Sequence, residues 1–200
     1  MWIEYSPLPF YTGYISVNTM KTHIESPRLI LREWDTKKDL EPFARMNADP
    51  LVMQYLPRVL NENASARHIK EFQEHFKKYG FGFYVLEKKD DGEFVGFVGI
   101  EHVDFKANFT PAIQLAWRLD YEYWGQGYAS EAAKAVIEHA FNELNIKELV
   151  AFSVHDNERI LHIFEKLGLK YQENEDFDYP ALKKGHPLGR FVLYKIKKDK

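Results

Sequence analysis

Two glycines and an alanine stand directly before a long amphipathic stretch, in the segment EYWGQGYASEAAKAV at residues 122–136. Gly127 and Ala129 are small residues two positions apart, so the backbone there can approach an anion closely. The free N–H groups of a first helical turn, together with the helix dipole, would hold that anion. Ser130 adds a hydroxyl donor. The segment therefore predicts a turn that binds phosphate, most simply a pyrophosphate.

Two common phosphate motifs fit this segment poorly. A Walker loop needs a lysine directly after its last glycine, and no lysine follows Gly125 or Gly127. The dinucleotide fingerprint needs a third small residue where this chain has Ser130, and an acidic residue at the end of the next strand, which is missing. A plain strand-to-helix turn, with glycines that serve only its geometry, stays open as the alternative.

Composition bounds the other classes of function. The chain has 200 residues, 45% hydrophobic and 16% aromatic, which is enough to bury one core. Its net charge of −3 argues against nucleic-acid binding. It contains no cysteine and no HExxH pattern, so we expect no metal site, and a reducing, cytoplasmic location fits. No apolar run approaches the about 20 residues of a membrane helix, and the first 19 residues do not resemble a signal peptide.

Hydrophobic periodicity predicts mixed strands and helices in a single domain. Helices are expected between Thr36 and Pro50, at residues 63–79 with Gly80 as a stop, at 129–144, and from the N-cap Asn157 to Leu167. Strands are expected at residues 28–34, 81–89, 93–103, 113–119, 148–154 and 191–196, with the second and third joined as a hairpin.

An ordered series of segments resembles the GNAT superfamily of acetyl-CoA-dependent N-acetyltransferases, in its RimJ/RimL-type branch. The family's pyrophosphate motif is Gln/Arg-x-x-Gly-x-Gly/Ala; Gly127 and Ala129 match its last two positions, while Trp124 occupies the first. The resemblance covers roughly residues 26–196, through SPRLILREW, DLEPFARMNADP, FVGFVGI, AIQLAWRLDYEYWGQGYASEAA, FEKLGL and PLGRFVLY.

The resemblance implies an α/β (α+β) fold, with a mixed, mostly antiparallel sheet that is split near its middle and has helices on both faces. It implies one acetyltransferase domain at residues 23–200, preceded by an appendage at 1–22. Acetyl-CoA would be the co-substrate. Its pantetheine arm would bond to backbone in the gap of the sheet, and its pyrophosphate would lie over residues 126–130. The residues so implied are Trp117, Arg118, Leu119, Trp124, Gly125, Gln126, Gly127, Tyr128, Ala129, Ser130, Asn157 and Phe164.

Four polar positions of the family are altered in this chain. Gln114 stands where this branch usually has a glutamate suited to act as base. Related enzymes carry a serine, a tyrosine that acts as an acid and a histidine where this chain has Ile160, Phe164 and Phe191, respectively. An acyl-CoA-binding or regulatory protein with this scaffold and with weak or no catalysis is therefore the alternative function.

Glu101 and His155 are the replacement bases that the sequence offers beside Gln114. Strand alternation puts Glu101 and His102 on opposite faces, so at most one of them faces the cleft. Deprotonating a lysine side chain near pH 7.5 costs about 4 kcal/mol, while an α-amine costs under about 0.7 kcal/mol. A site without a strong base therefore favours an α-amine. A protein N-terminus leads the expected acceptors, a small-molecule amine stays open, and we expect a monomer or homodimer.

Overall fold

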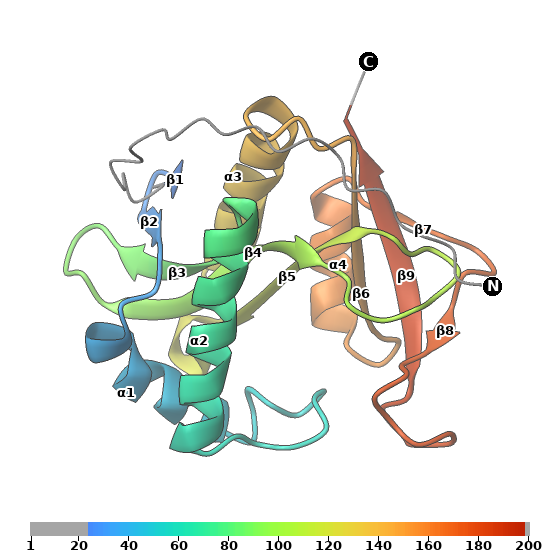
Figure 1. Ribbon diagram of the computed structural model, residues 1–200, viewed down its shortest axis with the longest axis horizontal. Helices are drawn as coiled ribbons and strands as arrows, with labels where there is room; N and C mark the ends of the chain where they lie inside the picture. Colours follow the sequence, from blue (N-terminus) through green and yellow to red (C-terminus); the bar gives the residue numbers. More distant parts are fainter. Residues whose placement is uncertain (1–23, 199–200) are drawn as a thin grey trace, which may run out of the picture.

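Residues 24–198 are the part of the chain that this structure, a computed structural model, describes (Figure 1). The predicted appendage at residues 1–22 lies outside the described residues. Strands and helices follow one another largely as the hydrophobic periodicity predicts. Among the described helices, none combines the length and the apolar character that crossing a membrane requires.

The first half of the chain forms short strands, two helices and a hairpin. Its elements are β1 (Ile24–Glu25), β2 (Leu29–Arg32), α1 (Thr36–Ala48), α2 (Glu62–Tyr79), β3 (Phe83–Lys88) and β4 (Phe94–His102). Asn61 caps α2, because its side chain accepts a hydrogen bond from the Ala64 N–H at 2.9 Å. Gly80 ends α2 in the left-handed conformation, at φ +76°, which confirms the predicted stop.

The second half alternates strands and helices. Its elements are β5 (Ile113–Leu119), a 3-10 turn at Tyr121–Tyr123, α3 (Tyr128–Asn142), β6 (Glu148–Val154), α4 (Glu158–Lys166), β7 (Lys170–Tyr171), β8 (Phe177–Asp178) and β9 (Arg190–Lys197). β5 and β6 have the predicted bounds. The two-residue strands β1, β7 and β8 were not predicted, because two residues are too few to show an alternating pattern.

The described strands form one sheet that is nearly split in two. Their order is β1-β2-β3-β4-β5-β6-β9-β7, with β8 paired to β9. β5 and β6 run parallel and share a single register pair, Gln114 with Val150, whereas β4 and β5 pair over seven residues. Beyond that pair the two strands separate toward Leu119 and Val154. The predicted split near the middle of a mostly antiparallel sheet is confirmed.

Helices cover both faces of the sheet, as predicted (Figure 1). α1 and α2 pack on one face over an aromatic core that includes Trp34, Phe43, Ile69, Phe72 and Phe97. α3 and α4 pack on the other face over a larger core that includes Val98, Leu115, Ala133, Leu149 and Phe164. The space between β5 and β6 therefore opens to two different faces, one beside α1 and α2 and one beside α3 and α4.

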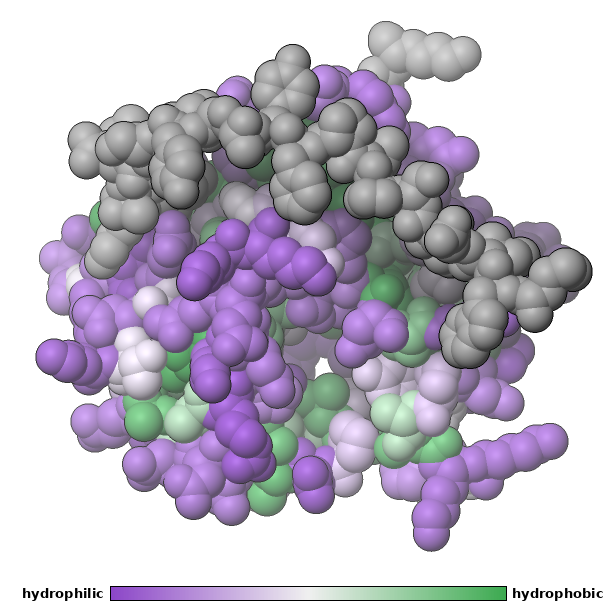
Figure 2. Space-filling model, viewed as in Figure 1, coloured by the Kyte–Doolittle hydropathy of each residue, from purple (hydrophilic) through white to green (hydrophobic). Residues whose placement is uncertain are grey.

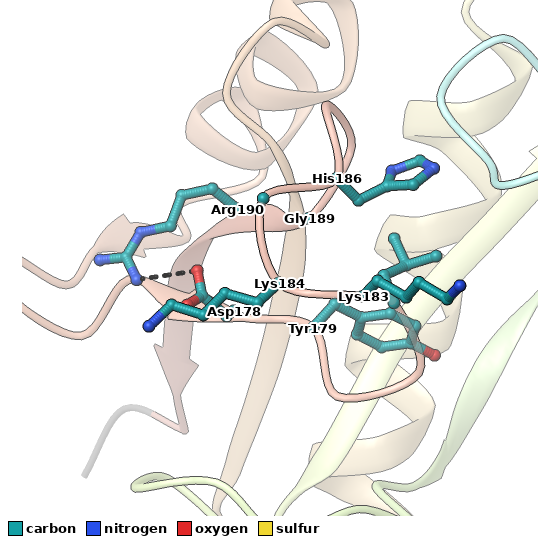
Figure 3. Close-up of a pocket in the computed structure, with 9 residues that line it drawn as sticks. Asp178, Tyr179, Lys183, Lys184, His186, Gly189 and Arg190 are labelled. Atoms are coloured by element: carbon teal, nitrogen blue, oxygen red, sulfur yellow. Dashed lines mark hydrogen bonds and ion pairs between the residues drawn. The ribbon is translucent and has the colours of Figure 1, made fainter.

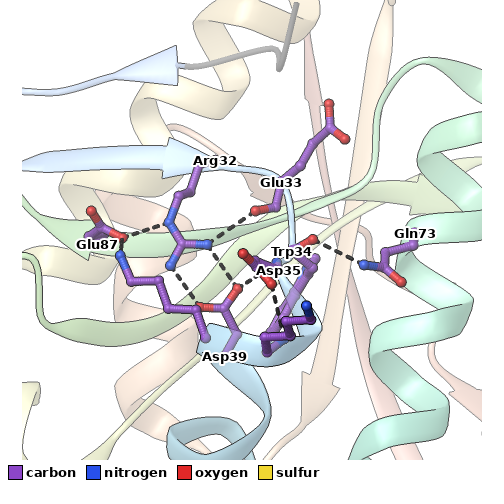
Figure 4. Close-up of polar contacts among 9 residues, drawn as sticks. Arg32, Glu33, Trp34, Asp35, Asp39, Gln73 and Glu87 are labelled. Atoms are coloured by element: carbon purple, nitrogen blue, oxygen red, sulfur yellow. Dashed lines mark hydrogen bonds and ion pairs between the residues drawn. The ribbon is translucent and has the colours of Figure 1, made fainter. Parts of the chain in front are cut away.

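A buried ion pair fixes α1 to the sheet (Figure 4). The Arg32 guanidinium donates two hydrogen bonds to the Asp39 carboxylate, at 2.8 and 2.7 Å, and a third to Glu87 at 2.6 Å. Asp39 is fully buried, so removing one partner would leave an uncompensated charge. This bidentate pair sets where α1 begins and thereby where its last turn, with Asn47, meets β5.

Candidate functional site

The glycine turn presents free amides at the start of α3. Gly127 is the N-cap at φ +83° and ψ 0°, and Gly125 also has a positive φ, of +76°. The first helical hydrogen bond runs from the Glu131 N–H to the Gly127 carbonyl at 3.0 Å. Within residues 24–198 no backbone or side-chain acceptor is recorded for the N–H groups of residues 128–130. Three amides at a helix N-terminus, reached over two glycines without side chains, fit a pyrophosphate.

Arg28 and Glu131 hold this turn against β2. The Arg28 Nε donates to Glu131 Oε2 at 2.7 Å, and its Nη1 donates to the Gln126 carbonyl at 3.1 Å. The Ser26 hydroxyl donates to Glu131 Oε1 at 2.7 Å. Burial opposes ionisation, but the bonds from Ser26 and Arg28 hold the pKa of Glu131 below its ordinary value. The sequence did not single out Arg28 or Glu131, although the matched segments SPRLILREW and YASEAA contain them.

Trp124, at the motif's altered first position, is bonded on one side and stacked on the other. Its Nε1 donates to the Leu119 carbonyl at 2.9 Å. The Arg159 guanidinium, from the first turn of α4, lies 4.4 Å from the centre of the Trp124 ring. A cation therefore stands beside the glycine turn even though the motif residue itself is uncharged.

Backbone groups of Trp117 and Leu119 point into the gap between β5 and β6. The Asp120 N–H donates to the carbonyl of Val95, the second residue of β4, at 2.9 Å. Alternation along an antiparallel pair then directs the Arg118 backbone toward β4 and the backbones of Trp117 and Leu119 away from it. The Leu119 carbonyl already accepts from Trp124, so Leu119 offers its N–H. These groups fit the amides of a pantetheine arm.

Side chains close the α3–α4 side of the gap. The Trp117 ring meets Phe164 edge to face, with ring centroids 5.5 Å apart, and Phe164 is 1% exposed. Phe164 occupies the position at which other family members carry a tyrosine that acts as a general acid. Here it packs beneath Trp117 in the core. Its contact with the cofactor arm, implied by the resemblance, would be made through Trp117.

Asn157 is the N-cap residue of α4, as predicted, but its side chain makes no capping bond. The structure records no side-chain capping bond at this N-cap position, and the Asn157 Nδ2 donates instead to the Ser153 hydroxyl of β6 at 3.2 Å. The predicted N-cap position is therefore confirmed, but the side chain turns toward the sheet and leaves the capping bond unmade. Asn157 stands at the open end of the gap, where β6 ends and α4 begins.

Glu101 and Gln114 face each other where the sheet begins to split. They are register partners across β4 and β5, and the Gln114 Nε2 donates to Glu101 Oε1 at 2.5 Å. Burial raises the pKa of Glu101 to about 7; the bond from Gln114 opposes this rise, and the charges of Asp104 and Glu71 add to it. A carboxyl that titrates near neutral pH is suited to exchange a proton with a substrate.

Arg118 lies on the same face as Gln114 and contacts α1. Its Nη1 donates to Asn47 Oδ1 at 2.6 Å, and the Asn47 Nδ2 donates to the Ser65 hydroxyl at 3.0 Å. Asn47 and Ser65 are fully buried. Burial lowers the pKa of Arg118 to about 10, which still leaves it charged near neutral pH. The Arg118 side chain thus belongs to the α1–α2 side of the gap.

His155 is apart from this pair. It follows β6 at the end where the strands have separated, its side chain is 83% exposed, and its Nδ1 lies 3.7 Å from Asp156. Gln114 lies at the opposite end of the gap, five residues before Leu119, which a strand spans in about 16 Å. Glu101 and His155 therefore do not form one site.

Comparisons with known proteins bear on this geometry. The family model "Acetyltransferase (GNAT) domain" matches residues 28–170. Two Bacillus subtilis proteins are each 28% identical: the uncharacterized protein YkkB, over 76% of this chain and 88% of its own length, and the uncharacterized N-acetyltransferase YnaD, over 87% and 96%. Spermidine N(1)-acetyltransferase of Escherichia coli is 35% identical over 41% of this chain and 42% of its own length.

Solved structures share the fold at low identity. An acetyltransferase (GNAT family) from Bacillus anthracis has a TM-score of 0.72 at 21% identity, covering 88% of this chain and 98% of its own. RimL, a ribosomal L7/L12 alpha-N-protein acetyltransferase solved in complex with coenzyme A, has a TM-score of 0.69 at 17% identity, covering 88% and 98%. These findings confirm the resemblance and the fold that the sequence predicts.

Proposed function

The acetyltransferase (GNAT) family model covers most of the chain, so this protein belongs to that family and is an N-acetyltransferase. We propose that Glu101 is the base of its reaction. The acetyl group would pass from acetyl-CoA directly to a primary amine. One observation carries the proposal: a carboxyl with a pKa of about 7 is held by Gln114 at the point where β5 and β6 separate.

Three groups of residues would hold acetyl-CoA. The amides of residues 128–130 would bind the pyrophosphate, with Arg28 and Glu131 fixing the turn. The backbones of Trp117 and Leu119 and the side chain of Asn157 would bond to the pantetheine arm. When bound, acetyl-CoA supplies an activated acyl group, whose thiolate leaves readily because a thiol's pKa is near 8.5. The remaining requirement is a neutral amine, which the protein's own residues must provide.

Glu101 would take the amine's proton. An amine attacks a carbonyl carbon only when its nitrogen lone pair is free, so an ammonium must first lose a proton. Glu101 becomes ionised as the pH rises through about 7, and its Oε1 is held by Gln114, which directs the carboxylate. An α-amine, with a pKa of about 7.7–8.0, is closer to this carboxyl than a lysine amine at about 10.4. This match favours an α-amine or another amine of low pKa.

The acceptor that these features favour is a protein N-terminus, with a small-molecule amine as the next candidate. The low pKa of an α-amine supports the first. The relatives' names include both kinds, a ribosomal-protein acetyltransferase and a spermidine acetyltransferase. A regulatory scaffold that binds acyl-CoA without catalysis is less well supported, since Glu101 supplies the titrating group that Gln114 cannot.

The test combines binding and turnover on the purified chain. Isothermal titration should give micromolar binding of acetyl-CoA, and Gly127→Glu should abolish it by placing a carboxylate over the turn. Free-CoA release should then depend on added amine, and peptides with a free N-terminus should react faster than peptides whose single amine is a lysine side chain. Binding of acetyl-CoA without amine-dependent release would support the regulatory scaffold instead.

A further inference from the structure

Six half-buried aromatic rings cover the face of β6 and β9 next to the Glu101–Gln114 pair. They come from the loop between β4 and β5, from β6, from β8 and its following residue, and from β9. We call this set the aromatic wall: Phe105, Phe109, Phe152, Phe177, Tyr179 and Phe191. The rings contact one another, with centroids 4.9 Å apart for Phe109 and Phe177 and 5.3 Å apart for Phe105 and Tyr179.

Phe152 and Tyr179 join the wall to the reaction site. Gln114 and Val150 are register partners, so the side chain of Phe152, two residues further along β6, lies on the same face as Gln114. At the wall's other end, burial together with the charges of Asp104 and Glu101 raises the pKa of the Tyr179 phenol. An amine placed at Glu101 would therefore have aromatic rings beside it.

The wall lies outside both hydrophobic cores. None of its six rings belongs to either core, and each keeps part of its surface exposed. α1 and α2 cover the other half of this face, while the loop of residues 103–112 crosses in front of β6 and β9 (Figure 1). In Figure 2 the surface is hollowed between α2 and the β6–β9 side, and hydrophobic residues lie at the margin of that hollow. Exposed apolar surface beside polar groups that converge on one point is typical of a ligand site.

A small pocket extends the wall at Tyr179. Figure 3 shows Tyr179 and His186 directed to one side of the β8–β9 loop, while Asp178 and Arg190 pair on the other side at 3.5 Å. The pocket between Tyr179 and residues 182–190 has a volume of about 130 Å³. Of the six rings of the wall, Tyr179 alone lines this pocket.

We propose that the aromatic wall binds an aromatic or comparably large apolar group carried within a few bonds of the acceptor's primary amine. This inference rests on the proposed function, because it names the class of amine that the same site acetylates. The amine would face Glu101, and the apolar group would lie against Phe152 and its neighbouring rings, where ring-to-ring contact adds to burial. The carboxylates of Asp104 and Glu71 would attract the incoming ammonium.

The experiment compares 2-phenylethylamine with ethylamine, with each kcat/KM expressed per concentration of neutral amine, because the phenyl group also lowers the pKa of the amine. We expect kcat/KM to be at least about tenfold higher for 2-phenylethylamine. Phe152→Leu, which keeps an apolar side chain but removes the ring, should reduce this ratio several-fold through KM. Phe109→Leu should act in the same direction. Tyr171→Leu removes an exposed ring on β7, outside the wall, and should leave the ratio unchanged.

A binding measurement separates this inference from the proposed function. The two amines are titrated into the protein with coenzyme A present, without turnover. Preferential binding of 2-phenylethylamine that weakens in Phe152→Leu supports the aromatic wall as a binding surface, even if no amine is acetylated. Absence of acetylation would then contradict the proposed function but not this inference. Equal binding of both amines, or a preference that the Phe152 and Phe109 variants leave intact, overturns the inference. So does tighter binding of spermidine that is insensitive to these variants.

Discussion

Gln114 donates a hydrogen bond to Glu101 at 2.5 Å, and Gln114 is also the residue at which β5 forms its one register pair with β6. The place where the sheet opens is therefore the place where a titrating carboxyl is held. The family's usual glutamate on β5 is replaced by an amide, which cannot take a proton near neutral pH. The carboxyl stands instead on the neighbouring strand, at the directly paired position. On the proposed function, the base stands one strand away from its usual place in the family.

Replacing Glu101 should slow the reaction while leaving the fold intact. Glu101→Gln keeps the size of the side chain and its bond with Gln114 but cannot accept a proton. We expect kcat/KM to fall by about 100-fold, the lower range for a general base. Because Glu101 must be ionised to act, the ratio of wild-type to variant kcat/KM should shrink as the pH falls through about 7.

The matched control is Asp104→Asn, an exposed carboxyl nearby on the β4–β5 loop. It should change kcat/KM by only a few-fold, since it acts through its field alone. The amine's own titration affects wild type and variants alike, so the ratio isolates Glu101. A ratio that stays constant between pH 5.5 and 8.5 would contradict the assignment of Glu101 as the base.

The Glu101 carboxyl should also make the folded protein less stable as the pH rises. Its pKa is about 7 in the folded protein, above the ordinary glutamate value, so the folded state binds the proton more tightly than the unfolded chain does. The folded state therefore loses stability as the pH rises from about 4.5 to 7. Glu101→Gln removes this loss, and its melting temperature should exceed that of wild type by a few degrees at pH 8 and by less at pH 5. Thermal unfolding followed by circular dichroism at both pH values measures this, and a gap that is equal at both would contradict the raised pKa.

The glycine turn at the start of α3 can be tested against another turn whose glycine has a similar positive φ. Gly127 has φ +83° at the start of α3, and Gly92 has φ +75° in the turn between β3 and β4. An alanine at either position is strained by roughly 1 kcal/mol. Gly127→Ala should also weaken acetyl-CoA binding about tenfold, because it shifts the amides of the turn, whereas Gly92→Ala should not. Calorimetric titration of both variants distinguishes the cases, and equal affinities would make the Gly127 turn purely structural.

Local patterns predicted most of the fold. β5 and β6 were predicted to the residue because β5 alternates apolar and other residues and β6 is a short apolar run, and Gly80 was predicted as a stop from its type alone. The strands β1, β7 and β8 contain two residues each and exist only because a longer strand lies alongside them. Their partners are set by the folded sheet, so no sequence window could show them.

The candidate site shows the same difference between local features and features that depend on the folded sheet. The glycine turn was visible in the sequence, since its glycines and the helix that follows are contiguous. The Glu101–Gln114 pair was not visible in the sequence, because it depends on the register between β4 and β5, which the twelve intervening positions do not specify. The N-cap position of Asn157 was predicted from its residue type, but its side-chain bond to Ser153 of β6 was not, because that bond depends on how the strand and the helix meet.

Arg159 should contribute to acetyl-CoA affinity from outside the glycine motif. Trp124 removes the polar or cationic side chain that the family has at this position, and the Arg159 guanidinium stacks on the Trp124 ring at 4.4 Å, beside the turn. A guanidinium held on an aromatic face can still donate at its edge to a phosphate. We expect Arg159→Ala to weaken acetyl-CoA binding about tenfold at low ionic strength and by less at high salt, because the side chain is exposed. Lys77→Ala, which removes an exposed charge from the last turn of α2, away from the glycine turn, is the control. If the two variants bind acetyl-CoA equally well at every salt concentration, Trp124 replaces the motif residue without help from Arg159.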